Sequence, residues 1–370
     1  MKSDFIIVGG GVNGMAAAYN LALQGAEVLV IEADSIASGA SGGFGQRGVR
    51  ANRRDLRELP LMREANEIWP TLHEELGAAT GYDRTGGVYF IDGPARSGFK
   101  GLGAAETYAR AQSAFGIRTE LWDLDRVRSE YPGIAGEIQA ASFVPTDGVA
   151  SHGQTTHAFA NAAQQRGVQV LENTRVTAIE TKSDGSATAV ITGSGERIAV
   201  GKALLLANNT GVRELVLEAV GVDLPTWTIY PQGSRLRTHK DVRIPRLTAH
   251  ETRSLSVKIL GDEIMLTGGW RGHDGQVVEA ALHDNIAVLT SVFPYLDDLE
   301  VLSSDASRAE SASVDQLPII GRVAPNVHVA TGWSGHGWAI APAVARHLAK
   351  ALLANADSAA LSAFSPSRFH

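Results

Sequence analysis

The sequence has no cysteine, and this absence excludes several kinds of site at once. Without thiols the chain can form no disulfide, thiolate metal site or redox dithiol, and it cannot attach a cofactor through a cysteine. Histidines and carboxylates at metal-ligand spacing are missing too, since His152 and His157 have no acid in register and are expected to be structural. We therefore expect no bound metal, and a chain without cysteine fits a cytoplasmic location.

Long apolar runs and an excess of positive charge are also missing. No uninterrupted apolar stretch approaches the ~20 residues of a membrane helix, and the first expected strand begins so near the N-terminus that we expect no signal peptide. The net charge of −7 offers no basic surface for nucleic acid. These absences favour a protein that binds small molecules, with neither nucleic acid nor membrane insertion, and they leave a homo-oligomer open.

The N-terminal segment has the pattern of a dinucleotide-binding strand–helix–strand unit. A strand over 4–8 leads into three glycines: Gly9 allows a sharp turn, Gly11 lets the backbone approach a pyrophosphate, and Gly14 lets the helix pack close to the sheet. The helix over 13–23 would direct its free N–H groups at the phosphates. The second strand, 28–31, ends at Glu32, about 20 residues beyond Gly11, where a carboxylate can accept a hydrogen bond from a ribose hydroxyl.

The remaining sequence predicts an α/β protein with an additional β-rich part. Helical patterns cover 56–69, 104–115, 158–165 and 341–353, and short strands are expected over 87–91, 168–171, 176–180, 187–192, 197–200, 202–207, 254–260 and 327–331. We predict a Rossmann-type nucleotide-binding domain formed by 1–84, 145–215 and 302–370. A second, largely antiparallel substrate-binding domain would comprise 85–144 and 216–301, so that both domains are discontinuous.

Two further glycine-rich loops, 38–43 and 332–337, accompany the single fingerprint and could enclose a larger ring. Together these segments resemble the family of FAD-dependent oxidases and dehydrogenases of amines and amino acids, which includes D-amino-acid oxidase, glycine oxidase and monomeric sarcosine oxidase. The resemblance also rests on the segments 147–149, 202–207 and 315–321. It implies a Rossmann-type FAD-binding domain with a second, antiparallel substrate domain.

The resemblance implies that FAD is bound noncovalently, because the chain lacks cysteine and loop 38–43 lacks histidine. The C-terminal glycine loop would stabilise negative charge on the reduced ring. Asn208 and Asn209 depart from the small residues usual in relatives. The expected cofactor residues are Gly9, Gly11, Val12, Asn13, Gly14, Glu32, Ala33, Ser38, Ala40, Ser41, Gly42, Gly43, Gln46, Arg47, Val176, Gly332, Trp333, Gly335, His336 and Gly337.

Arg47 and Arg50 are the main substrate-site candidates. Their spacing is similar to that of the arginine pair in sarcosine-oxidase-like members, where the first lies near the flavin and the second binds the substrate carboxylate. A guanidinium matches a carboxylate bidentately; the alternative is a solvated basic loop, since Arg53 follows closely. Weaker candidates for the catalytic site are His336, Tyr230, Arg235 and Trp270, and the role of Glu310 stays unassigned.

The expected reaction is oxidation of the C–N bond of an amino acid or N-substituted amino acid, by hydride transfer to flavin N5 that leaves an imine. Oxygen or an electron carrier would reoxidise the cofactor. Relatives place an oxygen-activating lysine on the strand that here covers 263–269, which has no lysine, and Lys258 is expected to face elsewhere. The alternatives are an FAD-dependent 2-hydroxy-acid dehydrogenase with His336 as base, a flavin-binding subunit of a larger amine dehydrogenase complex and, less favoured, an NAD dehydrogenase.

Overall fold

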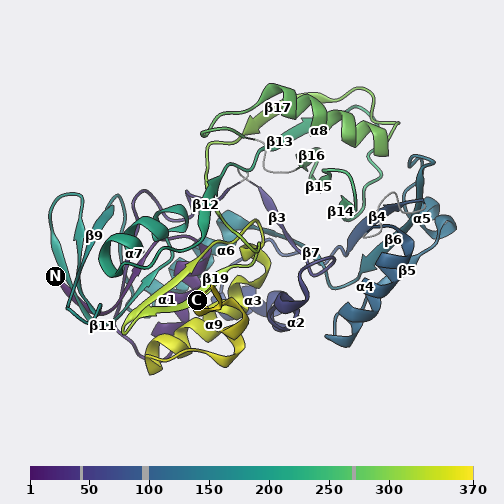
Figure 1. Ribbon diagram of the computed structural model, residues 1–370. Coiled ribbons are helices and arrows are strands. Elements are labelled where there is room, and N and C mark those ends of the chain that lie inside the picture. The colour runs from purple at the N-terminus through teal and green to yellow at the C-terminus, as the bar shows by residue number, and fades with distance from the viewer. Residues whose placement is uncertain (42–44, 94–99, 269–271, 370) are drawn as a thin grey trace.

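Two eight-stranded sheets organise the chain in the computed structural model, which describes residues 1–41, 45–93, 100–268 and 272–369 (Figure 1). The first sheet has a parallel centre in the order β20-β11-β1-β2-β8, with the antiparallel strands β19, β10 and β9 added. Its strands are β1 (Lys2–Val8), β2 (Val28–Ile31), β8 (Gln169–Leu171), β9 (Val176–Thr181), β10 (Ala187–Thr192), β11 (Arg197–Leu206), β19 (Ile319–Ala324) and β20 (Val327–Thr331).

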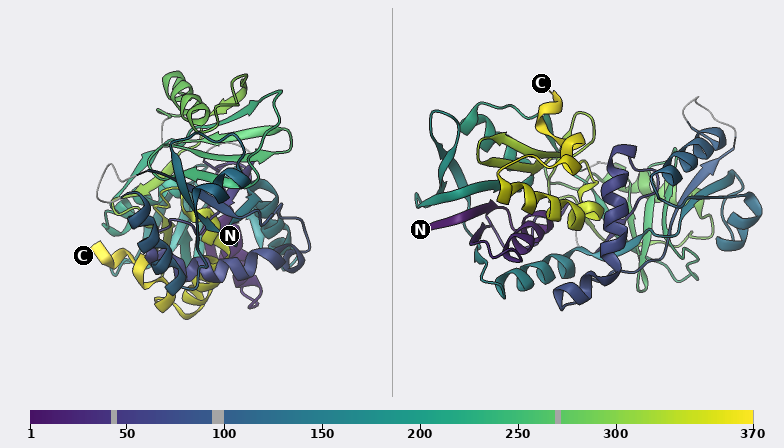
Figure 2. Two further views of the ribbon diagram at one scale, coloured as in Figure 1. Left: turned by 90° about the vertical axis from the view of Figure 1, so that its right-hand side faces the viewer. Right: turned by 90° about the horizontal axis from the view of Figure 1, so that it is seen from below.

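Helices cover one face of this sheet and share its core. They are α1 (Val12–Ala22), α2 (Leu59–Ile68), α3 (Leu72–Leu76), α6 (His152–Gln164) and α9 (Gly337–Ala354). Small residues let α1 approach its neighbours, because Ala16, Ala17 and Ala18 are fully buried. Seen from below, the purple α1 and the yellow α9 lie side by side (Figure 2). A second core on the other face includes α7 (Val212–Val220).

The second sheet is antiparallel except where β14 pairs with β4. Its order is β17-β13-β16-β15-β14-β4-β6-β5, formed by β4 (Gly87–Asp92), β5 (Glu120–Trp122), β6 (Ile138–Val144), β13 (Gly233–Arg237), β14 (Leu247–His250), β15 (Ser256–Leu260), β16 (Glu263–Thr267) and β17 (Glu300–Asp305). The helices of this part are α4 (Leu102–Ala114), α5 (Leu124–Glu130) and α8 (Glu279–Val292). In Figure 1, α8 lies on the outer face of the sheet, where Val257 and Ile264 join its core.

Two short strand pairs lie between the sheets. β3 (Gln46–Val49) pairs with β7 (Gly148–Ser151), and β12 (Thr226–Ile229) pairs with β18 (Glu310–Ser313). Both pairs join segments that are distant in the sequence, so they connect the two parts of the molecule through ordered backbone. A 3₁₀ turn, η1 (Leu56–Glu58), follows β3 and precedes α2.

The predicted fold class is confirmed, with local corrections. β11 is one continuous strand where we predicted two, since it pairs with both β10 and β1. Neither β3, over residues 46–49, nor α8 was predicted. The predicted domain limits at 215/216 and 301/302 fall inside α7 and β17, and the division itself remains a prediction. Among the helices of the described ranges, none is long and apolar enough to cross a membrane.

Candidate functional site

The glycine turn after β1 has the geometry that each glycine was predicted to allow. Gly9 adopts φ 113°, and a Cβ atom there would lie 2.6 Å from the carbonyl oxygen of Ala207. A Cβ atom on Gly14 would lie less than 3.0 Å from the carbonyl oxygen of Gly9, so that helix α1 can pack this closely only without a side chain. A Cβ atom on Gly11 would meet nothing within 4 Å. Gly11 therefore borders open space instead of packed protein.

A cavity of about 590 Å³ begins at this turn. Glu32 shapes its entrance, since one carboxylate oxygen accepts from the Gly10 N–H at 2.6 Å and the other from the Asp34 N–H at 2.9 Å. Many of the predicted cofactor residues line the cavity: Gly9, Gly11, Val12, Asn13, Glu32, Ala33, Ser38, Ala40, Ser41, Arg47, Val176, Trp333, Gly335 and Gly337.

The other predicted cofactor residues lie elsewhere. Gly14 is packed against Gly9, Gln46 pairs with Ser151 in the β3–β7 ladder, and Gly332 is surrounded by Ser313, Ile319 and Thr226. His336 lines a second cavity instead. Gly42 and Gly43 lie outside the described residues.

The residues of the first cavity fit a dinucleotide. Helix α1 begins at Gly11 with no side-chain cap, so its first N–H groups and the positive end of its dipole are available to a pyrophosphate. The side chains of Asn13, Asn208 and Trp338 also line the cavity, and each has a buried polar atom without a hydrogen-bond partner among the described residues. Buried polar atoms of this kind are costly unless a ligand or water satisfies them.

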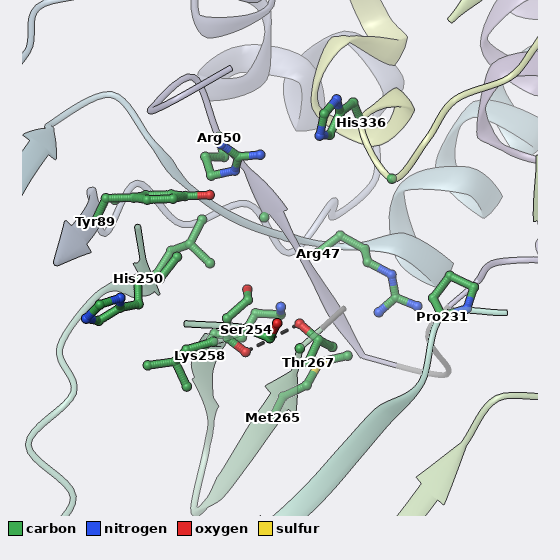
Figure 3. A pocket seen from close by; sticks show the side chains of 18 of the residues that line it. Arg47, Arg50, Tyr89, Pro231, His250, Ser254, Lys258, Met265, Thr267 and His336 are labelled. Atoms are coloured by element: carbon green, nitrogen blue, oxygen red, sulfur yellow. Dashed lines mark hydrogen bonds between the residues drawn. The ribbon is translucent and has the colours of Figure 1, made fainter. Parts of the chain in front are cut away.

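The second cavity, of about 390 Å³, lies between the short pair β3–β7 and the second sheet (Figure 3). It shares Ser41, Arg47, Glu310 and Gly335 with the first cavity, so that the two spaces meet at these residues. In Figure 3, Arg50, Tyr89 and His336 lie on one side of the pocket, and Lys258, Met265 and Thr267 of the second sheet lie on the other. A long cofactor in the first cavity would thus present one end to a small molecule in the second.

Arg50 belongs to the wall of the second cavity. Its guanidinium carbon lies 5.4 Å from the centroid of the Tyr89 ring, and Nη1 donates to the Asn52 carbonyl oxygen. Among the described residues, no carboxylate lies within 4.0 Å of this guanidinium. The backbone just after Arg50 is held by Asp147, whose carboxylate accepts from the Ala51 N–H at 2.6 Å and from the Asn52 N–H at 3.1 Å.

Arg47 lies at the junction of the two cavities. Its Nη2 donates to the Ser41 carbonyl oxygen at 2.7 Å, and burial lowers the pKa of the guanidinium to about 10, opposed by the charge of Glu310. The Glu310 carboxylate accepts from the Ser41 hydroxyl and from the Gly335 N–H. Glu310, which the sequence left without a role, therefore ties the loop after β2 to the C-terminal glycine loop.

The expectation that Lys258 faces away from the site is wrong. Lys258 lies on β15, lines the second cavity and is only 5% exposed. Val257 and Ile259, its neighbours on the strand, point to the opposite face, where they contribute to the core under α8. Burial, followed by the charge of Arg47, lowers the pKa of Lys258 to about 7.

Two of the weaker candidates lie outside the cavities. Arg235 pairs with Met265 across the β13–β16 ladder and so lies on the cavity face of the sheet, but its side chain is exposed, forms an ion pair with Glu263 at 2.5 Å and lines neither cavity. Tyr230 lines neither cavity, although Pro231 and Gln232 beside it line the second. Trp270 lies outside the described residues. The sequence also did not single out Tyr89, which stacks on Arg50.

A Rossmann-type sheet with a dinucleotide cavity, joined to a small-molecule cavity under a second sheet, defines a nucleotide-dependent oxidoreductase. The chain matches the family described as FAD dependent oxidoreductase (DAO) over residues 4–351 and belongs to it. FAD is therefore the cofactor, and the predicted membership of the amine and amino-acid oxidoreductase family is confirmed.

One relative is sarcosine oxidase subunit beta of Arthrobacter sp, which is 25% identical to this chain over 99% of its length and 91% of that protein. Monomeric sarcosine oxidase of Bacillus sp. (strain B-0618) is 34% identical over 47% of this chain and 43% of its own length. Some matches are thus partial, and the chain spans 22% of the mitochondrial pyruvate dehydrogenase phosphatase regulatory subunit of Mus musculus. Among solved structures, L-proline dehydrogenase from P. horikoshii has a TM-score of 0.87 and 26% identity, covering 100% of this chain and 98% of its own.

Proposed function

We propose that the protein oxidises the carbon–nitrogen bond of an amino acid or N-substituted amino acid, with Arg50 as the carboxylate-binding residue. The observation that carries this proposal is the Arg50 guanidinium, which lines the second cavity and has no ion-pair partner among the described residues. A cation in a partly buried wall favours an anionic ligand, and a guanidinium binds a carboxylate through two parallel hydrogen bonds. The names of the relatives, sarcosine oxidase and L-proline dehydrogenase, support a substrate of this class.

FAD, noncovalently bound in the first cavity, would supply the hydride acceptor for this reaction. The residues of the chain orient the substrate: the Arg50 clamp would fix the carboxylate, and the Tyr89 ring stacked on Arg50 limits the rotation of the guanidinium. Strands β14 and β16 line the cavity with the apolar side chains of Leu247, Ala249 and Met265, which would limit the access of water to the reacting atoms.

Lys258 favours oxygen as the electron acceptor. Its side chain makes no hydrogen bond or ion pair within the described ranges, and its ammonium could stabilise the negative charge that oxygen gains on reduction. We expect Lys258→Met to slow oxygen consumption at least 10-fold while reduction of an artificial dye acceptor changes less than 2-fold. Equal losses with both acceptors would instead place Lys258 in substrate binding, and a wild-type protein that reduces the dye but consumes little oxygen would be an electron-carrier dehydrogenase.

A 2-hydroxy-acid dehydrogenase is the second candidate function. It is favoured by His336, a histidine in the wall of the same cavity whose pKa is held well below its ordinary value by burial, so that it is a neutral base. Both candidate functions use Arg50 to bind the substrate carboxylate. They differ in the substrate atom that loses its proton, which is the nitrogen of an amino acid or the hydroxyl oxygen of a 2-hydroxy acid. Because sarcosine oxidase and opine oxidase relatives are named as subunits, a role within a larger complex also stays open.

The test is anaerobic bleaching of the flavin by a panel of D-, L- and N-alkyl amino acids and 2-hydroxy acids. We expect an amino acid to bleach the wild-type protein, and Arg50→Ala to weaken its apparent Kd at least ~10-fold, since a bidentate charge pair contributes a few kcal/mol. Arg53→Ala is the matched control, because Arg53 lies three residues further on, pairs with Glu251 and lines neither cavity. An unchanged Kd in Arg50→Ala, or bleaching by hydroxy acids alone, would refute the proposal.

A further inference from the structure

His336 has two differently placed ring nitrogens. The residue precedes helix α9, and its side chain is 25% exposed into the second cavity. The Nδ1 atom, however, is buried and has no hydrogen-bond partner among the described residues. The ring therefore turns Nδ1 into the protein and leaves its other edge, with Nε2, at the cavity.

Glu58 lies behind this histidine. Its side chain is fully buried, and Oε2, which has no hydrogen-bond partner within the described ranges, is 3.5 Å from His336 Nδ1. Oε1 accepts from Arg54 Nη1 at 3.0 Å, and the same Nη1 donates to the His336 carbonyl oxygen at 2.9 Å. Arg54 thus holds the carboxylate and the backbone of His336 together.

The surrounding charges fix the protonation of the pair. Burial, Arg54 and Arg50 lower the pKa of His336 well below its ordinary value, whereas Asp55 opposes them, so the imidazole is neutral. Burial raises the pKa of Glu58, and Arg54 and Arg50 counteract it. Because a buried guanidinium without a counter-charge would be very unfavourable, Glu58 is ionised beside Arg54. The other charged or titratable side chains that line the cavity are Arg47, Tyr89, His250, Arg253, Lys258 and Glu310.

We propose that Glu58 is a positioning residue that keeps the proton of neutral His336 on Nδ1, so that Nε2 accepts a proton from the ammonium group of the substrate. This inference rests on the proposed amino-acid oxidation. Amino acids carry an ammonium group at neutral pH, and its nitrogen needs a free electron pair before the neighbouring carbon can lose a hydride. In the proton transfer the substrate N–H bond breaks, its electron pair stays on the nitrogen, and the proton bonds to Nε2. The resulting imidazolium lies against the Glu58 carboxylate, which stabilises its charge.

A second glutamate–histidine pair provides a matched control. Glu64 Oε2 and His347 Nε2 lie 2.7 Å apart and join α2 to α9, but neither residue lines the two cavities. Glu64→Gln therefore removes a similar pair from the same part of the fold without touching the site.

The first test reads the tautomer directly, by nitrogen NMR of histidine-labelled holoenzyme, with the His336 signals assigned by their loss in His336→Asn. We expect the Nδ1–H tautomer in the wild-type protein and in Glu64→Gln. In Glu58→Gln the amide can donate to Nδ1, so the proton should move to Nε2. An Nε2–H tautomer in the wild-type protein, or an unchanged tautomer in Glu58→Gln, would overturn the assignment.

The second test measures anaerobic flavin reduction by a saturating amino acid against pH. Glu58→Gln should reduce more slowly at pH 7, by at least ~10-fold given the usual contribution of a general base. The rate should recover toward the wild-type value above the pKa of the amine, because the substrate is then already deprotonated, and Kd for an unreactive carboxylate analogue should stay the same. A uniform loss at every pH would show a merely structural role. If no amino acid reduces the flavin, the proposed function fails, while the tautomer measurement still decides the placement of the proton.

Discussion

Replacing Gly11 or Gly14 by alanine separates cofactor binding from folding. A Cβ atom on Gly14 would lie less than 3.0 Å from the carbonyl oxygen of Gly9. Because that oxygen belongs to the backbone, the contact can be relieved only if α1 shifts away from the sheet. Forcing such a contact in a packed core costs about 3 kcal/mol or more. A Cβ atom on Gly11 meets nothing within 4 Å, and its φ of −74° suits alanine, so the stability of the apoprotein should change by less than ~1 kcal/mol.

Although Gly11→Ala should hardly change the stability of the apoprotein, it should weaken the binding of FAD. Its Cβ atom would occupy the space through which the pyrophosphate approaches the N-terminus of α1, and we expect Gly11→Ala to weaken FAD binding at least ~100-fold, or about 2.7 kcal/mol. Thermal unfolding of the apoproteins and titration of FAD by fluorescence quenching give the two quantities. The reasoning is refuted if Gly11→Ala binds FAD as the wild type does, or if its apoprotein loses as much stability as that of Gly14→Ala.

Two further predictions concern buried charges. Burial lowers the pKa of Lys258 to about 7, below its ordinary ~10.4, so the native state binds fewer protons than the unfolded state between these values and wild-type stability rises with pH there. Lys258→Met should therefore raise Tm more at pH 6 than at pH 9, and equal shifts would contradict this. Asp147→Ala leaves the N–H groups of Ala51 and Asn52 without their acceptor. It should lower the free energy of unfolding by about 2–4 kcal/mol and raise KM through Arg50; denaturant unfolding and initial rates check both.

The parts of the site that depend on local sequence were predictable. The glycine spacing after β1 determines which positions tolerate a side chain, and the spacing of Arg47 and Arg50 brings both to the second cavity. The missed residues depend on contacts between distant segments. Lys258 is a site residue because the inner face of β15 borders the cavity, which its own strand does not reveal.

Distance along the chain explains the other misses. Glu58 matters through His336, and the Arg54–His336 hydrogen bond that joins their segments spans 282 positions. Arg235 lies on the face of β13 that the cavity borders, yet its ion pair with Glu263 and its distance from the cavity lining depend on neighbouring strands that its own sequence does not reveal.

The Glu310 contacts have a consequence for biosynthesis. The carboxylate joins Ser41, 269 positions earlier in the chain, to Gly335 near the end, and the central strand β11 also pairs with β20. A chain still being translated has made the glycine turn and the arginine pair but lacks both the carboxylate and the loop that complete the junction of the two cavities. The flavin site is therefore assembled only after the segment that carries Glu310 and Gly335 has been synthesised, and cofactor capture would follow that step instead of guiding the first stages of folding.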